Sequence, residues 1–274
     1  MDIRDRLLVA TMASDAAEMA ATYGVGLELD QFSWANNMDG NMEAFDREIR
    51  RMKEITDRMI LHAPYSEVLP AAIDERVRKV SMERLNEAYA LCRKYGINRM
   101  VVHSGFIPEV YFPGWYLNEA VTFWKKFMED KPETFRIMIE NQMETDKDFL
   151  PRVCRQIDDP RVGLCLDIGH MLYKGNGLAG EWIKAFSPYC THVHLHHNDR
   201  TWDYHYPLDV PGTEDMNEVL QCILTEMRGV TITLEHITSE SSFLWLKKYG
   251  YLSAENREKG KKYQGFNSIA NIKE

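Results

Sequence analysis

Eight short apolar runs, rich in Val, Ile, Leu and Met, constrain the fold of this chain more than any other feature. Each run is hydrophobic almost without interruption, which is typical of strands buried on both faces of a parallel sheet. Stretches with helical periodicity separate most of the runs, so strands and helices alternate. Eight such units predict a single (β/α)8 TIM barrel of the α/β class. The runs are residues 7–12, 25–32, 58–65, 99–106, 135–142, 162–170, 190–199 and 230–237.

The chain is expected to form one domain. Its 274 residues would also allow two domains, but a barrel of about 250 residues fits equally well. We find no linker of Ser, Gly or Pro, so we expect the barrel over residues 1–250. Residues 251–274 are polar and lack a strand signal, which predicts a tail or a partner-binding extension. Helices are expected at 15–23, 42–56, 72–94, 116–130, 148–156, 179–186, 214–228 and 241–248.

Charge and composition exclude several classes of protein. The 42 acidic and 33 basic side chains give a net charge of −9, whereas binding to nucleic acid usually relies on clustered Lys and Arg. No apolar run approaches the roughly 18 residues of a membrane span, and the first residues lack the apolar core of a signal peptide. The five cysteines form no C-x-x-C pair and are expected to be reduced core residues. We expect a cytoplasmic protein without a membrane partner. The sequence leaves open whether the protein forms a homo-oligomer.

Histidines are unevenly placed along the chain. All nine fall in the later half of an expected strand or in the loop after it, and none falls in an expected helix. In a barrel of this kind the C-terminal ends of the strands surround the active site. The histidines are therefore expected to gather at one mouth of the barrel. They are His62, His103, His170, His192, His194, His196, His197, His205 and His236.

Carboxylates repeat the pattern. Glu140, Asp167 and Glu235 each follow several apolar residues at the end of an expected strand. An unpaired ionised carboxylate is costly in such a place, and the nearby arginines stand at strand starts, at the opposite end of the barrel. Carboxylate oxygen and imidazole nitrogen are common ligands of divalent metals. The sequence therefore predicts a metal site.

Strand alternation narrows the choice of histidine ligand. Successive side chains of a strand point to opposite faces, so His192, His194 and His196 share one face. His194 is the natural ligand. His192 lies nearer the strand start and could equally be a packed core histidine, and His196 and His197 are more exposed candidates for substrate contacts.

Seven short motifs occur in order at the strand ends, and together they resemble the xylose isomerase-like TIM barrels. This family includes sugar phosphate isomerases and epimerases and is related to endonuclease IV, or AP endonuclease family 2. The resemblance covers the chain from about the second strand to the eighth. The motifs are HAPY at His62, VVHSG at His103, IEN at Glu140, CLDIGH at Asp167 to His170, HVHLHHND at His192 to Asp199, DYHYP at Asp203 to Pro207 and LEH at Glu235.

The resemblance implies a divalent metal, Mn, Zn, Mg or Co, and assigns residues to it. Its usual metal ligands correspond to Glu140, Asp167, His194 and Glu235. A second metal or the substrate would be held by His103, His170, Asp203 and His205, and the substrate would contact His62, His170 and His196. Endonuclease IV also has a zinc-binding His in an extended loop after strand three, and we find no second histidine there.

Two functions follow from this resemblance. The first is a metal-dependent isomerase or epimerase acting on a small sugar, sugar phosphate or cyclitol through an enediolate, with Glu140 and Glu235 as the catalytic acid/base pair. Trp34, Phe106, Trp115 and Tyr173 would be pocket walls. The alternative is an endonuclease IV-like zinc phosphodiesterase, in which a bridging hydroxide attacks phosphorus. The acidic charge favours the small carbohydrate over nucleic acid. A third interpretation is a barrel that binds a ligand without catalysing a reaction. The presence of both Glu140 and Glu235 argues against it.

Overall fold

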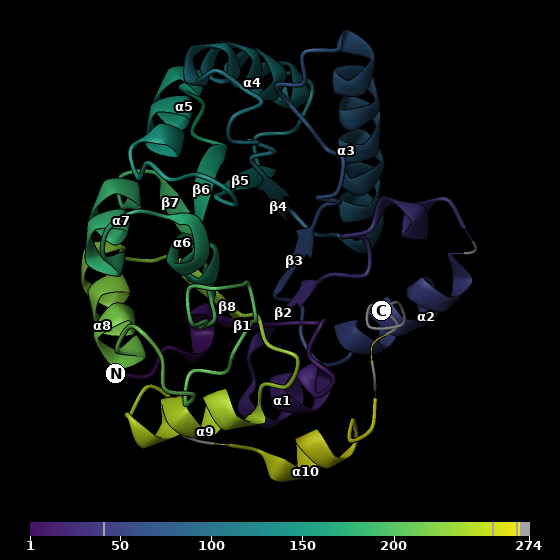
Figure 1. Cartoon of the computed structure of the whole chain (residues 1–274). Helices are drawn as coiled ribbons and strands as arrows, with labels where there is room; N and C mark the ends of the chain where they lie inside the picture. Colours follow the sequence, from purple (N-terminus) through teal and green to yellow (C-terminus); the bar gives the residue numbers. More distant parts are fainter. Residues whose placement is uncertain (41, 254, 267, 269–274) are drawn as a thin grey trace.

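The strands close into a single parallel barrel, as predicted. The computed structural model describes residues 1–40, 42–253, 255–266 and 268. Each strand pairs with the next along the chain, and β1 also pairs with β8 (Figure 1). The strands are shorter than the apolar runs because the runs continue into the loops that follow them. They are β1 Leu7–Ala10, β2 Gly26–Leu29, β3 Met59–His62, β4 Arg99–His103, β5 Arg136–Glu140, β6 Val162–Asp167, β7 Cys190–Leu195 and β8 Thr231–Leu234.

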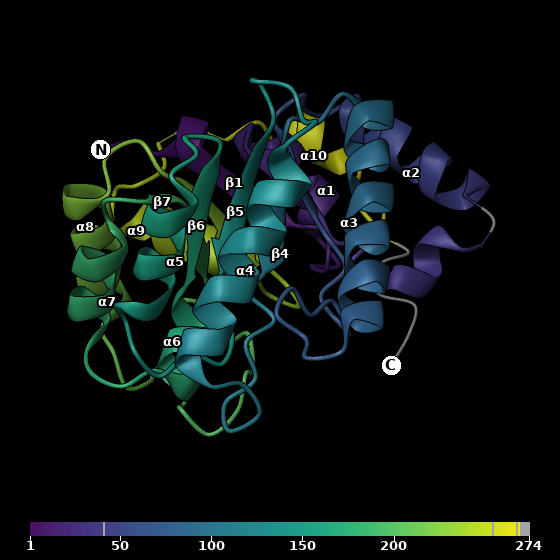
Figure 2. The same cartoon turned by 90° about the horizontal axis from the view of Figure 1, so that it is seen from above.

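Helices surround the barrel on the outside (Figures 1 and 2). All eight predicted helices are present, with ends that differ by a few residues. The helix–strand turns after α1 and α3 place Gly24 and Gly96 in the left-handed region, at φ of 69° and 68°, which favours glycine. The eight helices are α1 Ala16–Tyr23, α2 Glu43–Lys53, α3 Glu75–Tyr95, α4 Pro113–Met128, α5 Phe149–Ile157, α7 Ala179–Phe186, α8 Met216–Glu226 and α9 Glu240–Lys248.

One helix that the sequence did not predict changes the position of a site residue. Helix α6, Ile168–Lys174, starts directly after β6 and contains His170, so the expectation that no histidine lies in a helix was wrong. The apolar run of residues 162–170 predicts a strand that continues to residue 170. The chain turns into a helix earlier because the Asp167 carboxylate caps it, accepting a hydrogen bond from the His170 backbone N–H at 2.6 Å.

The C-terminal segment packs on the outside of the barrel. Its short helix α10, Arg257–Lys261, lies along α1 (Figure 1), and the Asn256 backbone N–H donates to the Thr22 carbonyl at 2.6 Å. Tyr263 packs against alanines of α1. Residues 254, 267 and 269–274 lie outside the described part of the chain, and the domain division at residue 250 stays a prediction.

Two layers of side chains fill the inside of the barrel below its mouth. Five apolar side chains contact one another as a cluster separate from the main core: Leu8, Ile60, Val101, Met138 and Cys165. Next to this cluster lies a polar layer that contains Glu28, His192, His194 and Thr233, all 0% exposed. The main core packs between the strands and the outer helices. No helix within the described residues is long and apolar enough to cross a membrane.

Short 3-10 helices complete the fold, at Arg4–Arg6 before β1 and at Ala35–Met38 after β2. The second of these belongs to the loop that carries Trp34 to the rim of the mouth.

Candidate metal centre

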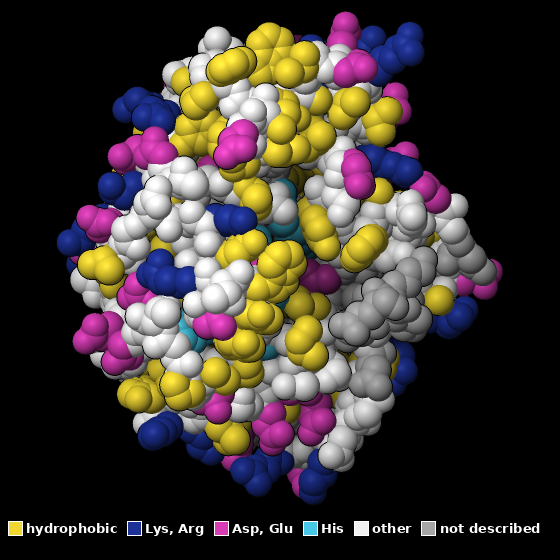
Figure 3. Space-filling view, in the orientation of Figure 1, with side chains coloured by type: hydrophobic (Ala, Val, Ile, Leu, Met, Phe, Trp, Pro, Cys, Tyr) yellow, Lys and Arg dark blue, Asp and Glu magenta, His cyan; other side chains and the backbone are white. Residues whose placement is uncertain are grey.

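A cavity of about 640 Å³ opens at the C-terminal ends of the strands. Figure 3 shows histidine and acidic side chains in a hollow near the middle of this face. None of the residues that line the cavity is Lys or Arg, although four are acidic. They are Met12, Ser14, Asp30, Ser33, Trp34, His62, Tyr65, His103, Glu140, Gln142, His170, Asp203, His205, Glu235 and Ile237.

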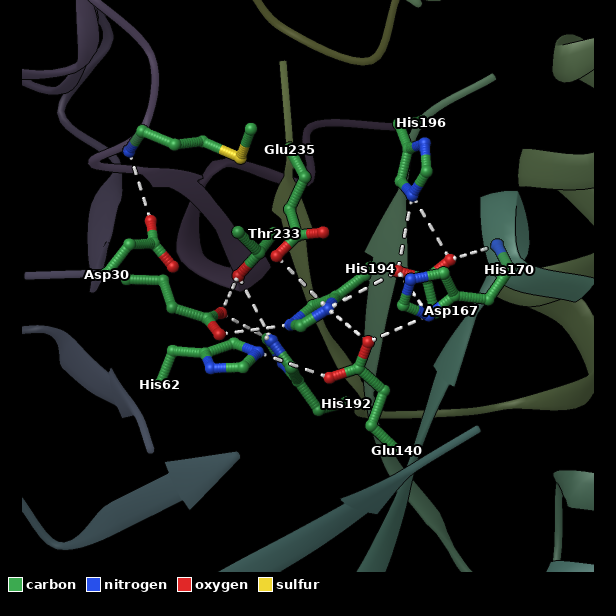
Figure 4. Close-up of polar contacts among 12 residues, drawn as sticks. Asp30, His62, Glu140, Asp167, His170, His192, His194, His196, Thr233 and Glu235 are labelled. Carbon is green, nitrogen blue, oxygen red and sulfur yellow. Dashed lines mark hydrogen bonds and ion pairs between the residues drawn. The ribbon is translucent and has the colours of Figure 1, made fainter. Parts of the chain in front are cut away.

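The structure brings together the four residues that the sequence assigns to the metal. His194 Nδ1 lies 3.4 Å from Glu140 Oε1, 3.5 Å from Asp167 Oδ2 and 3.2 Å from Glu235 Oε1 (Figure 4). Glu140 and Asp167 are the last residues of β5 and β6, His194 is the last but one of β7, and Glu235 directly follows β8. Three neighbouring strands and the residue after a fourth therefore bring one candidate ligand each to one point.

The electrostatics of this point favour a cation. Burial raises the pKa of Glu235 to about 8, with Asp167 and Glu140 adding to the rise against the opposing effect of His194. For Glu140, burial also raises the pKa, but His103 and His194 outweigh it and hold the pKa well below its usual value. Asp167 and Glu140 thus disfavour the ionised form of Glu235, and a divalent ion bound between the three carboxylates would favour it.

Glu28 is a buried carboxylate that the sequence reasoning missed. It lies within β2, and its Oε1 is 3.0 Å from His194 Nε2 while its Oε2 is 3.0 Å from His192 Nε2. Thr233 Oγ1 donates to the same Oε2 at 2.5 Å. The sequence does contain a signal for Glu28, because it is a carboxylate inside the apolar run VGLEL. The cost of burying an unpaired carboxylate, which singled out Glu140, Asp167 and Glu235, applies to it as well.

His62 and His103 lie on the other oxygen of Glu140. Their Nε2 atoms are each 3.3 Å from Glu140 Oε2, and the two rings contact each other edge to face. The resemblance assigns His62 to the substrate and leaves the chain without the histidine expected after strand three. The geometry places His62, the last residue of β3, next to the carboxylate with His103.

A second group of polar side chains lies farther out. Asp203 Oδ2 is 3.2 Å from both His170 Nε2 and His205 Nε2. His170 also reaches inward, with its Nδ1 3.1 Å from Glu140 Oε1. The outer group, His170, Asp203 and His205, is therefore joined to the central one through Glu140.

His196 and His197 are not exposed, contrary to the expectation from the sequence; both are 0% exposed. His196 stacks on His205 with ring centroids 4.0 Å apart, and its Nε2 lies 3.1 Å from Asp167 Oδ1. The His197 ring packs over Gly212. Burial occurs because the loop after β7 folds back and pairs with the strand end at His197 and Tyr206.

Of the aromatic residues expected to form pocket walls, only Trp34 lines this cavity. Phe106 packs against Tyr116 and Phe149 in the core. Trp115 donates its indole N–H to the Ala71 carbonyl at 3.0 Å, and Tyr173 lies beside Trp202. Tyr65, which the sequence reasoning did not name, is a wall of the cavity and stacks on His103.

Buried polar atoms that make no hydrogen bond test whether these residues fit a metal ion. Within the described residues, five buried ring or carboxylate atoms of the site make no hydrogen bond: His103 Nδ1, Glu140 Oε2, His194 Nδ1, His196 Nδ1 and Asp203 Oδ1. Buried polar atoms are normally satisfied, so such a concentration requires an explanation such as a bound ion. Among the groups whose ligating atoms lie within 4.8 Å of one another are Glu140, Asp167 and His194; His62, His103 and Glu140; and His196, Asp203 and His205. The residues fit divalent cations with nitrogen and oxygen ligands.

The fold and this site define a class of protein. The family model described as xylose isomerase-like TIM barrel matches residues 14–257. The chain belongs to this family, which confirms the resemblance found in the sequence. It is also 26% identical over 205 residues to the uncharacterized protein MJ1311 of Methanocaldococcus jannaschii, covering 69% of each chain.

The solved structures that resemble this one include sugar epimerases. A D-tagatose 3-epimerase-like protein superposes with a TM-score of 0.67 at 23% identity, covering 89% of this chain and 96% of that one. The protein TTHB071 from Thermus thermophilus, in crystals soaked with ZnCl2, gives a TM-score of 0.72 at 21% identity, covering 89% and 98%. At these identities the similarity shows the shared fold.

Proposed function

We propose that this protein is a divalent-metal-dependent isomerase or epimerase that acts on a small carbohydrate through an enediolate. The observation that carries the proposal is the position of Glu140 and Glu235, whose oxygens approach His194 Nδ1 from β5 and from the end of β8. Two carboxylates on either side of one metal position can serve both as ligands and as acid/base groups. Sugar epimerases among the structural neighbours support this assignment.

The residues of the site would divide the work as follows. Glu140, Asp167, His194 and Glu235 would hold the cation, which when bound polarises a carbonyl and stabilises the negative charge of an enediolate. One glutamate would remove the proton from the carbon next to the carbonyl, and the other would return a proton from the opposite side. His170 would hold a substrate hydroxyl, and His62 and His103 would fix the orientation of the Glu140 carboxylate. A neutral polyol suits the cavity because no Lys or Arg lines it.

Proton exchange with solvent tests the proposal. In D₂O with Mn²⁺, we expect the protein to introduce deuterium at the carbon next to the carbonyl of a ketose, detected by NMR. Glu235→Gln should abolish the exchange, whereas Glu83→Gln, on the exposed surface of α3, should leave it unchanged. Lack of exchange with a panel of ketoses and ketose phosphates, in protein that contains its metal, would count against the isomerase.

A zinc phosphodiesterase is the second candidate, and one observation favours it. The site contains more ligating groups than one ion uses, because His62 and His103 flank Glu140 and an outer group surrounds Asp203. Several ions could then generate and orient a hydroxide for attack on phosphorus. One ion per chain would support the isomerase. Three zinc ions, together with incision of DNA containing an abasic site that Glu140→Ala abolishes, would support the phosphodiesterase.

A further inference from the structure

A buried polar layer lies directly beneath the metal centre, inside the barrel. Glu28 on β2 reaches His194 and His192 on β7, residues 166 and 164 positions away in the sequence. The Nδ1 atom of His194 faces the metal centre, and the Nε2 atom of the same ring faces Glu28. The layer therefore connects the metal centre to β2, a strand that contributes none of the four proposed ligands.

The contact with Glu28 determines which nitrogen of His194 carries a proton. An ionised carboxylate only accepts hydrogen bonds, so the 3.0 Å contact requires the proton on His194 Nε2. In a neutral imidazole the other nitrogen then presents its lone pair. That nitrogen, Nδ1, faces the carboxylates of Glu140, Asp167 and Glu235, where a cation would sit.

Glu28 is itself held in place from its other side. Its Oε2 accepts from Thr233 Oγ1 at 2.5 Å and lies 3.0 Å from His192 Nε2. The second nitrogen of His192, Nδ1, is 2.6 Å from Thr231 Oγ1, so both ring nitrogens have partners. A side chain with this many fixed contacts cannot turn away from His194 without breaking several of them.

We propose that Glu28 is a positioning residue of the metal centre, which fixes the Nε2–H tautomer of His194 and aims its Nδ1 at the cation. The proposal rests on the metal site of the proposed function. Carboxylates that orient a ligating histidine from behind raise its basicity, and their loss typically weakens metal binding by about 10- to 100-fold. His192 and Thr233 act one step further back, by holding Glu28.

A competing arrangement uses Glu28 directly. One oxygen of Glu28 lies within 4.8 Å of ligating atoms of His62, His194 and Glu235, so an ion could also sit between these groups. In that case Glu28 would be a ligand and His194 would bind through Nε2. The two arrangements differ in which nitrogen of His194 is metallated, which can be measured on the unchanged protein.

NMR of the zinc-loaded wild-type protein distinguishes them. Long-range ¹H–¹⁵N spectra, assigned with a His194→Gln sample, report the protonation and metallation of each ring nitrogen. We expect a protonated Nε2 in slow exchange with solvent and a metallated Nδ1. Metallation of Nε2 would overturn the proposal and make Glu28 a ligand.

A titration with Co²⁺ alone, followed by its visible absorption, measures the contribution of Glu28. Glu28→Gln keeps the shape of the side chain but can offer an amide N–H to His194, which would move the proton to Nδ1. We expect affinity to fall by about 10- to 100-fold, with a changed absorption band. The control Glu83→Gln is the same type of substitution on the exposed surface of α3, and it should leave the affinity unchanged.

His194→Ala separates failure of this inference from failure of the proposed site. If His194→Ala binds Co²⁺ as tightly as the wild type, the proposed metal site is wrong, and the role of Glu28 falls with it. If His194→Ala loses the ion and Glu28→Gln does not weaken it, the site stands and the positioning role is refuted. Should Glu28→Gln fail to fold, the NMR result on the wild type still decides.

Discussion

His236 is a fully buried histidine that directly follows the proposed ligand Glu235, and its Nε2 lies 3.0 Å from Ser242 Oγ. Burial lowers its pKa to about 3, helped by the nearby His196 and His205. An unfolded chain binds a proton at this histidine near pH 6.5, so between about pH 3 and 6.5 the unfolded state holds more protons. Stability is therefore complete above pH 6.5 and decreases as the pH falls.

We expect His236 to make the protein sensitive to acid. Between pH 7.5 and 4.5, the wild type should lose about 2 to 3 kcal/mol more free energy of unfolding than His236→Gln does. Urea unfolding at several pH values measures this. Because the variant lacks only this titrating group, contributions of other histidines cancel. A difference that stays constant with pH would contradict the burial of a neutral His236.

We expect His205 to bind the substrate and not the central metal ion. Its Nε2 contacts Asp203, and its Nδ1 lies 3.1 Å from the Glu235 carbonyl oxygen, outside the set around His194. His205→Ala should weaken substrate binding and leave the number of ions per chain unchanged, as measured by elemental analysis. Loss of one ion in this variant would instead favour several metals and the phosphodiesterase.

Helices α6 and α7 offer a matched pair of glycines. A Cβ atom on Gly169 of α6 would lie 1.8 Å from the His196 ring, whereas one on Gly180 of α7 would meet nothing closer than 3.9 Å. The short distance shows that α6 packs directly on the buried histidine. Close packing here holds His196 against Asp167 of the candidate metal centre.

We expect Gly169→Ala to destabilise the protein by about 1 to 3 kcal/mol, because the ring or the helix must move. Gly180→Ala should be neutral or stabilise by about 0.5 to 1 kcal/mol, because alanine favours a helix over glycine. Chemical unfolding of the two variants measures both effects. Equal effects of the two substitutions would show that α6 does not press on His196.

Removal of the metal is expected to affect the stability of the whole barrel. The proposed ligands come from β5, β6, β7 and the end of β8, so an ion would link strands from half of the barrel. An ion present at about 100 times its dissociation constant stabilises the folded state by about 2.7 kcal/mol. This corresponds to a melting temperature lower by roughly 5 to 10 °C after chelation.

Calorimetry with and without a chelator measures this shift. His194→Ala is the control, because a variant without the central ligand should melt at the same temperature in both conditions. An equal shift in the wild type and in His194→Ala would mean that the chelator acts elsewhere, and the central metal site would have to be abandoned.

The order of strands, the closed barrel and the positions of the eight outer helices could be predicted from the sequence. These features follow from local patterns, because apolar runs and helical periodicity are read within a few residues of the chain. Glu140, Asp167 and Glu235 could also be singled out, since each stands where its own strand ends and parallel strands end on one side.

Only the tertiary structure determines which side chains contact one another across the barrel. The contact of Glu28 with His192 and His194, the approach of His62 to Glu140 and the burial of His196 under a returning loop all join residues distant in sequence. Helix α6 begins where the Asp167 side chain caps it, a competition between strand and helix that periodicity cannot settle. Strand ends specify which groups reach the mouth, but only the closed barrel sets which atoms face one another and which are left for a cation.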